Sequence, residues 1–66
     1  MRWEAFEIWA LKGDRWELIA WFHDFDVARA VAQARSGPVR LVHAVSDGGK
    51  VERDTLAQIG EVREHP

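Results

Sequence analysis

The ionisable residues closest to a catalytic grouping surround one short segment. His23, Asp24 and Asp26 follow an apolar stretch, and Glu4 lies opposite His23 if the first two apolar segments form a hairpin. A histidine beside a carboxylate can act as a general base, and a histidine with two carboxylates can bind a metal ion. The structural alternative makes Glu4 and His23 a cross-strand pair and Asp24 a helix cap. We favour this alternative, and we expect no catalytic residue, no metal site and no enzyme.

The remaining chemically versatile residues carry weaker signals. His43 shares its strand parity with Leu41 and Val45, so we expect a buried, hydrogen-bonded histidine rather than a ligand. Gly48-Gly49-Lys50 lacks the spacing of a phosphate-binding loop. The chain has no cysteine, which excludes disulfides, thiol nucleophiles and cysteine-based metal sites. The sequence therefore predicts no cofactor.

Tryptophan is the unusual feature of the composition, with four tryptophans and three phenylalanines among 66 residues. Aromatic side chains either stack on bases and sugars or fill a small core. Nine Lys and Arg against eleven Asp and Glu leave a net charge of −2, which argues against a dominant basic surface for nucleic acid. No apolar run approaches the roughly 20 residues of a membrane span. We expect a cytoplasmic protein that does not contact a membrane and whose favoured partner is not nucleic acid.

Two aromatic segments, residues 3–11 and 15–23, are typical of strands and flank the turn residues Gly13 and Asp14. A two-residue Gly-Asp loop favours a type II′ hairpin. Its register would place Leu11 opposite Trp16, Ile8 opposite Ile19 and Phe6 opposite Trp21. A longer loop would shift this register.

This register predicts two apolar faces on the hairpin. The first carries Trp3, Ala5, Glu7, Trp9, Leu11, Trp16, Leu18, Ala20 and Phe22. The second has an apolar centre within a charged rim, and that centre consists of Phe6, Ile8, Ile19 and Trp21. We expect an alanine-rich helix to cover the first face. The second face would then stay uncovered, so its centre is our candidate interaction site.

The rest of the chain completes an α+β fold of order ββαββ, with an antiparallel sheet and one main helix on one face. The pattern of residues 25–36 predicts the helix, which Asp24 caps at its start and Gly37-Pro38 terminates. Residues 39–46 predict a third strand and 50–53 a short fourth. For residues 54–62 two readings remain: a short helix begun by Asp54, which we favour, or a continued strand. The last four residues read as a tail.

The segment from Phe22 to Ala28 resembles a recurrent strand-to-helix junction, in which a strand-ending Phe precedes a capping residue, an acidic residue and an inward Ala. Similar junctions occur in plant ethylene-response-type DNA-binding domains and in the arm domains of phage-type integrases. The order of elements over residues 6–55 also resembles that of small bacterial ββαββ domains. The DNA-binding domains present a basic sheet, whereas here Glu4, Glu7 and Glu17 lie on the hairpin. The resemblance therefore implies a fold and assigns no functional residue.

A chain of 66 residues is one small domain, residues 1–66, and buries only about 60% of its surface on folding. With no disulfide available, a partner would stabilise it. We therefore expect a small non-catalytic protein-interaction module, a homodimer or an accessory subunit of a larger protein. Two alternatives stay open: nucleic-acid binding through the aromatic hairpin, and a small inhibitor of another protein.

Overall fold

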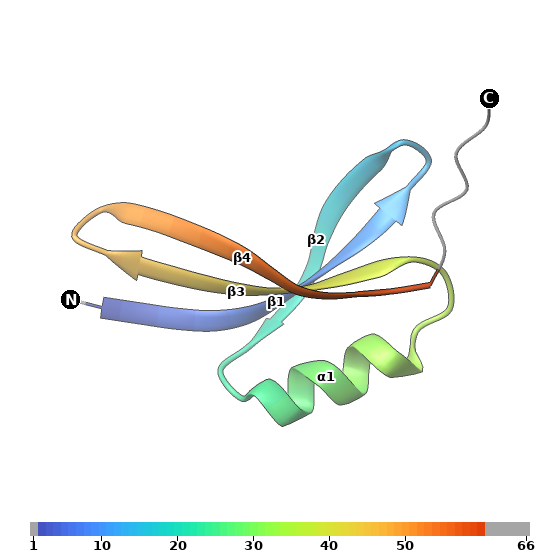
Figure 1. Ribbon diagram of the computed structural model, residues 1–66, viewed down its shortest axis with the longest axis horizontal. Helices are drawn as coiled ribbons and strands as arrows, with labels where there is room; N and C mark the ends of the chain where they lie inside the picture. The colour runs from blue at the N-terminus through green and yellow to red at the C-terminus, as the bar shows by residue number, and fades with distance from the viewer. Residues whose placement is uncertain (1, 61–66) are drawn as a thin grey trace.

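The fold is one antiparallel sheet with one helix against it (Figure 1). The computed structural model describes residues 2–60. The sheet has the strand order β2-β1-β3-β4, which places β1 and β3 in the middle. The elements are β1 (Arg2–Lys12), β2 (Arg15–Phe22), α1 (Phe25–Ala34), β3 (Val39–Asp47) and β4 (Lys50–Ile59). The α+β class is confirmed.

Both hairpins turn on two residues, and the Gly13-Asp14 turn of the first is the two-residue loop that the sequence predicts. Lys12 pairs with Arg15 around Gly13, whose φ is 66°, and no described non-glycine residue has a positive φ. A glycine with positive φ only at the first loop position defines the type II′ turn. In the second hairpin Gly48 and Gly49 have φ values of 60° and 86°, which fits a type I′ turn. Glycine is required at these positions because side chains with a Cβ rarely adopt positive φ.

A β-bulge in β2 changes the register of the first hairpin. Trp9 pairs with Leu18 but Ile8 pairs with Ala20, so Ile19 is an extra residue in β2. Beyond the bulge Phe6 pairs with Phe22, and Trp21 moves to the other face. The predicted pairs Ile8–Ile19 and Phe6–Trp21 are therefore wrong. The bulge places Phe22 with Phe6 on one face and leaves Trp21 on the other.

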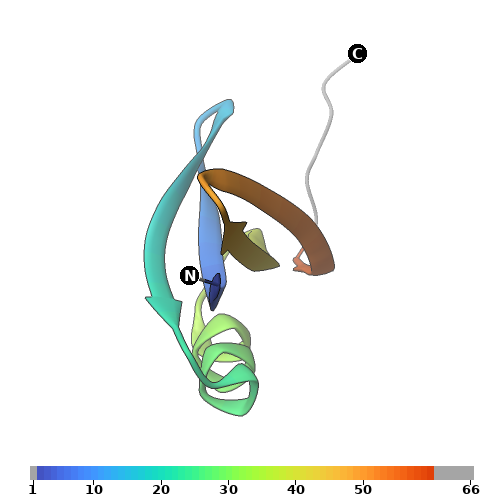
Figure 2. The same cartoon turned by 90° about the vertical axis from the view of Figure 1, so that its left-hand side faces the viewer.

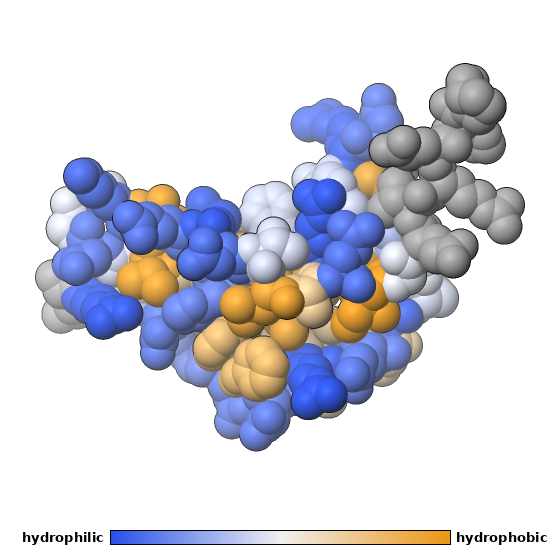
Figure 3. All heavy atoms as spheres, viewed as in Figure 1, coloured by the Kyte–Doolittle hydropathy of each residue, from blue (hydrophilic) through white to orange (hydrophobic). Residues whose placement is uncertain are grey.

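The helix α1 covers the face of Ile8, opposite to our expectation (Figure 2). Ala28 and Ala32 are buried against the sheet, and their small side chains let the helix approach closely. The space between the helix and the sheet is filled by branched side chains of moderate size rather than by tryptophan. The buried cluster consists of Ile8, Ala10, Ala28, Ala32, Val39 and Leu41. In the view of Figure 3, apolar residues gather where helix and sheet meet, and polar residues cover the hairpin ends.

Asp24 caps the helix as predicted. Its Oδ1 accepts hydrogen bonds from the backbone N–H groups of Asp26, at 2.8 Å, and Val27, at 3.3 Å. We expect Asp24→Ala to lower the free energy of unfolding by about 1 kcal/mol, because two N–H groups lose their acceptor. Chemical denaturation measures this change. Asp26→Ala is the matched control and should cost less, because Asp26 contributes only a charge near the helix N-terminus.

Strand β4 extends to Ile59, so the favoured short helix is wrong for residues 54–59. The backbone of this segment pairs with β3 along its length in an antiparallel ladder. A second bulge, at Leu56, disturbs the alternation of side chains between the two faces by which a strand is recognised in a sequence. Gly60 ends the strand with a φ of 88°, and a Cβ there would lie 3.1 Å from the Gly37 carbonyl oxygen. Val62 and the predicted tail lie outside the described residues.

Candidate interaction surface

The side of the sheet away from α1 carries all four tryptophans, and no described element covers it (Figure 2). We call this side the open face. The register assigns to it Trp3, Ala5, Glu7, Trp9, Leu11, Trp16, Leu18, Trp21, Arg40, Val42, Ala44, Ser46, Val51, Arg53, Thr55 and Gln58. The three phenylalanines lie instead on the helix side or in the helix. The bulge at Ile19 thus helps to place phenylalanine and tryptophan side chains on opposite faces of the sheet.

One end of the open face is an exposed aromatic cluster. Trp3 is 40% exposed and Trp21 is 51% exposed, and their ring centroids lie 6.0 Å apart in an edge-to-face arrangement. His23 adds a third ring, 5.2 Å from Trp21. Leu18 and Val51 are also about half exposed on this face. Exposed apolar side chains gathered on one face are typical of contact surfaces on small proteins.

The other two tryptophans are half-buried beneath arginines. The guanidinium of Arg40 lies 4.0 Å from the ring centroid of Trp16, and that of Arg53 lies 5.9 Å from Trp9. The Arg40 Nε also donates a hydrogen bond to Gln58 at 3.2 Å. Both contacts are within the range of cation–π attraction, and at 4.0 Å the Arg40 guanidinium packs directly against the Trp16 ring. Both arginines are therefore held in place on the face.

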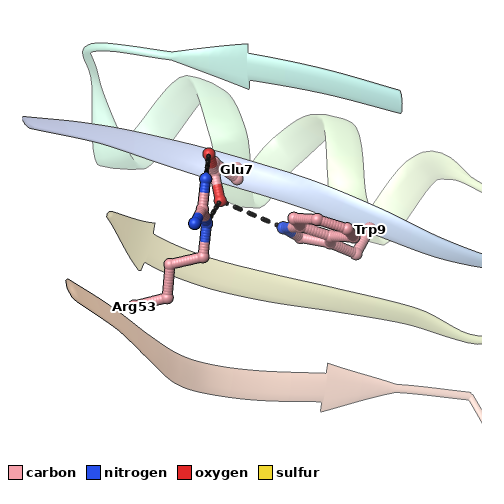
Figure 4. A network of polar contacts seen from close by, with 3 residues as sticks. All are labelled: Glu7, Trp9 and Arg53. Carbon is pink, nitrogen blue, oxygen red and sulfur yellow. Dashed lines mark hydrogen bonds and ion pairs between the residues drawn. The ribbon is translucent and has the colours of Figure 1, made fainter. Parts of the chain in front are cut away.

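A buried carboxylate lies in the middle of the open face (Figure 4). Glu7 is only 3% exposed. Its Oε1 accepts hydrogen bonds from the Arg53 Nε, at 2.9 Å, and from the Trp9 indole N–H, at 3.1 Å, while the Arg53 Nη2 donates to Oε2 at 3.4 Å. Arg53 comes from the edge strand β4 and reaches across β3 to β1. A charged group buried this far requires such partners, and here its charge is neutralised locally.

We expect Arg53→Met to lower the free energy of unfolding by about 1–3 kcal/mol, because Glu7 would keep only the Trp9 donor. Denaturation at one fixed protein concentration measures the change. Arg40→Met serves as the control and should have a smaller effect, because its bond to Gln58 is exposed. An equal effect of the two substitutions would mean that the buried carboxylate does not depend on Arg53.

The candidate interaction residues do not share one surface. Ile8 is 0% exposed in the core, and Phe6 and Ile19 are half-buried against that core on the helix side. Trp21 lies on the open face. The expectation of one uncovered patch containing all four is wrong because the helix covers one face and the bulge moves Trp21 to the other. Sequence reasoning missed Trp3, Leu18, Glu7 and Arg53 as parts of the uncovered surface.

The histidines and acids occupy structural positions. Glu4 pairs through its Oε2 with the His43 Nε2 at 3.0 Å, and its backbone oxygen contacts the His23 Nδ1 at 3.1 Å. His43 also stacks on Phe6 with centroids 4.9 Å apart, which confirms a hydrogen-bonded histidine, although it is half-buried rather than buried. Asp24 is occupied as the helix cap. Residues 2–60 contain no group of three or more ligands that would hold a metal ion.

A hollow lies at the β3–β4 hairpin. Its volume is about 270 Å³, and it is lined by Arg2, Val45, Asp47, Lys50 and Glu52. Substrate sites are typically at least about 300 Å³ and mostly apolar. This hollow is small and lined mainly by charged side chains of both signs. It does not provide the surroundings in which a substrate is desolvated.

Both edge strands are unsuited to pairing with another chain. β2 carries the bulge at Ile19, and β4 carries one at Leu56. Exposed charges follow the outer strands, among them Arg15 and Glu17 on β2 and Glu52 and Asp54 on β4. Bulges and edge charges are common means by which proteins prevent edge-to-edge association. A partner is therefore better accommodated on the open face than at an edge.

Comparisons with protein-family models, curated proteins and solved structures give no match. No helix among the described residues is long and apolar enough to cross a membrane. The open face is thus identified by its geometry and chemistry alone.

Proposed function

We propose that the protein is a non-catalytic interaction module of the cytoplasm, and that it forms a homodimer in which two open faces stack. The observation that carries this proposal is that all four tryptophans lie on one uncovered face of the sheet. The face that our sequence reasoning expected to be uncovered is occupied by the helix. We therefore assign the contact surface to the open face, which carries the tryptophans.

The composition of the open face supports a protein partner. Tryptophan and arginine are enriched where binding energy concentrates in protein interfaces, whereas lysine and acidic residues are depleted there. Among the described residues, the charged side chains of the open face are Glu7, Arg40 and Arg53, and two of these neutralise each other. The Glu7–Arg53 pair therefore adds no net charge to a contact, and Arg40 leaves one positive charge on each face, held over the Trp16 ring.

The area of the open face also suits a dimer. With strands about 4.8 Å apart and rising about 3.3 Å per residue, a four-stranded face of this length covers on the order of 500 Å² in projection. Standing tryptophan and arginine side chains enlarge the accessible area beyond the projection. Stable interfaces bury about 800 Å² per partner. The projected area is smaller than this, so a single stack of the two faces suits an interface at the lower end of the size range.

The shape of the sheet supports a second copy in particular. The two hairpins diverge from each other across the sheet, so that the twisted open face is a saddle (Figures 1 and 2). Rotating such a saddle by 180° about an axis that runs along its strands turns the surface over but leaves its shape unchanged. The raised diagonal of one copy then meets the hollow diagonal of the other. Two-fold contacts of this isologous kind are the commonest in homo-oligomers.

Tryptophan emission tests the proposal, since the four tryptophans report on the open face. We expect a blue-shifted emission maximum at high protein concentration that moves to longer wavelength on dilution, as the rings become hydrated. Trp3 and Trp21 should dominate the shift because they are the most exposed. An emission maximum that stays constant while the measured mass remains that of one chain would contradict the dimer. If a second, different chain were found bound to this one at a constant mass ratio, the protein would instead be an accessory subunit or an inhibitor.

A second candidate function is the binding of single-stranded nucleic acid. The observation in its favour is that Arg40 and Arg53 lie over tryptophan rings, because cations interleaved with aromatic rings suit bases and phosphates. Titration with short oligonucleotides at low salt tests it. The dimer proposal predicts no quenching of tryptophan at tens of micromolar. Strong quenching that weakens steeply with added salt would favour nucleic acid instead.

A further inference from the structure

We propose that the exposed aromatic cluster at one end of the open face binds a small quaternary ammonium compound. The cluster consists of Trp3, Trp21 and His23. All three residues belong to one chain, so this binding site does not depend on the proposed homodimer. The class of ligand follows from the arrangement of the rings, from their charge distribution and from the hydrogen-bonding groups that surround them.

The three rings of the cluster stand steeply against one another. The ring planes of Trp3 and Trp21 meet at 68°, those of Trp3 and His23 at 84°, and those of Trp21 and His23 at 77°. Trp3 is 40% exposed and Trp21 is 51% exposed, so part of each ring is open to solvent. A rounded group that lies against the cluster can therefore touch more than one aromatic surface at a time.

The charge distribution of these rings favours a cation. The face of an aromatic ring carries negative charge, and tryptophan attracts cations more strongly than the other aromatic residues do. The chain itself uses this attraction, because the guanidinium of Arg40 lies 4.0 Å from the ring centroid of Trp16 and Trp9 also has an arginine over its ring. Over Trp3 and Trp21, the described part of the chain places no cation. The net charge of −2 likewise favours a positive ligand over a negative one.

Hydrogen bonding selects a cation that has no N–H groups. The His23 Nδ1 lies 3.1 Å from the Glu4 backbone oxygen, and since a carbonyl only accepts, Nδ1 donates this bond. The Nε2 of His23 is then the one acceptor among the three rings, because an indole N–H only donates. A primary ammonium has three donors and a guanidinium has five, so most of them would lose water without finding a new acceptor. A quaternary ammonium has no such donor and presents apolar methyl groups instead.

A tryptophan fluorescence titration with choline tests this inference. We would use the native chain at a concentration at which its mass is that of one chain, because the proposed dimer covers the cluster. The expected result is a saturable change in emission, since Trp3 and Trp21 are the most exposed of the tryptophans. The neutral analogue, in which a carbon atom replaces the ammonium nitrogen, has the same shape and should bind at least about tenfold more weakly. Equal binding of the two compounds, or no saturable change with choline, would overturn the inference.

Two substitutions that leave the charge unchanged locate the site. Trp21→Leu should weaken choline binding at least about fivefold, because one aromatic surface is lost. Phe25→Leu is the matched control and should leave the affinity unchanged, because Phe25 is 38% exposed but lies in the helix on the other side of the sheet. Far-UV circular dichroism checks that both variants are folded, and Trp3→Leu tests the same cluster through a second ring.

Unchanged choline affinity in both Trp21→Leu and Trp3→Leu would place the bound cation elsewhere and contradict the proposed site. The outcome for the homodimer is separate, because choline binding is measured on single chains. A native chain whose mass stays that of one chain at every concentration would refute the dimer and leave the choline result as it is. The two failures are therefore distinguishable.

Discussion

Ile8→Ala is expected to remove much of the stability of the fold. Ile8 is 0% exposed and is among the largest fully buried side chains of the described core, in the same cluster as Ala28 and Ala32. Replacing such a residue by alanine costs about 2–5 kcal/mol. A domain of this size has roughly 3–10 kcal/mol of stability in total. Denaturant unfolding followed by far-UV circular dichroism would show a large shift of the midpoint, or an unfolded chain.

Ile19→Ala is the matched control for this prediction. Ile19 is half-buried at the β2 bulge, so its truncation should cost clearly less than that of Ile8. The comparison also tests which face the helix covers. If Ile8→Ala cost less than about 1 kcal/mol, Ile8 would not lie in a packed core, and the position of α1 would be wrong.

Leu18→Glu is expected to separate the proposed dimer into single chains. Leu18 is 43% exposed on the open face, and stacking would bury both the rest of its side chain and the new charge. The lost apolar contact and the desolvated carboxylate together amount to a few kcal/mol, so the dissociation constant should rise by about 100-fold. Sedimentation velocity at a series of concentrations measures this change.

Val27→Glu is the control for Leu18→Glu. Val27 is 45% exposed and lies on the helix, on the other side of the sheet from the open face. It matches Leu18 in exposure and in the charge introduced, and it should leave the mass unchanged. If both substitutions weaken the dimer equally, the weakening would reflect a general destabilisation of the chain. Should Val27→Glu alone dissociate, the contact would involve the helix side instead.

Most elements of this fold were predictable from local sequence signals, whereas the second half of β4, residues 54–59, was not. The Gly13-Asp14 turn and the Asp24 cap act within a few residues, and each forms where the sequence indicates. The bulges at Ile19 and Leu56 were not predictable in this way. A bulge depends on how two strands pair along their length, and a single extra residue exchanges the two faces of a strand.

One acidic residue explains why the helix does not cover the tryptophan face. Glu7 interrupts the tryptophan face that we expected to lie beneath the helix. A carboxylate there would need a cation, and the covering side of an alanine-rich helix provides none. Arg53 supplies it from the distant strand β4, a contact between residues 46 positions apart. Glu7 was thus evidence against helix coverage, whereas its partner could be found only in the folded structure.

The central claim is that two copies of this chain stack through their tryptophan faces. Sedimentation equilibrium of the native chain tests it most directly. We expect a mass of twice 7.6 kDa at high concentration that falls towards 7.6 kDa on dilution, and a Leu18→Glu variant that stays at the lower mass. A native chain that remains at 7.6 kDa up to about 1 mM, and that is indistinguishable from Leu18→Glu, would contradict it.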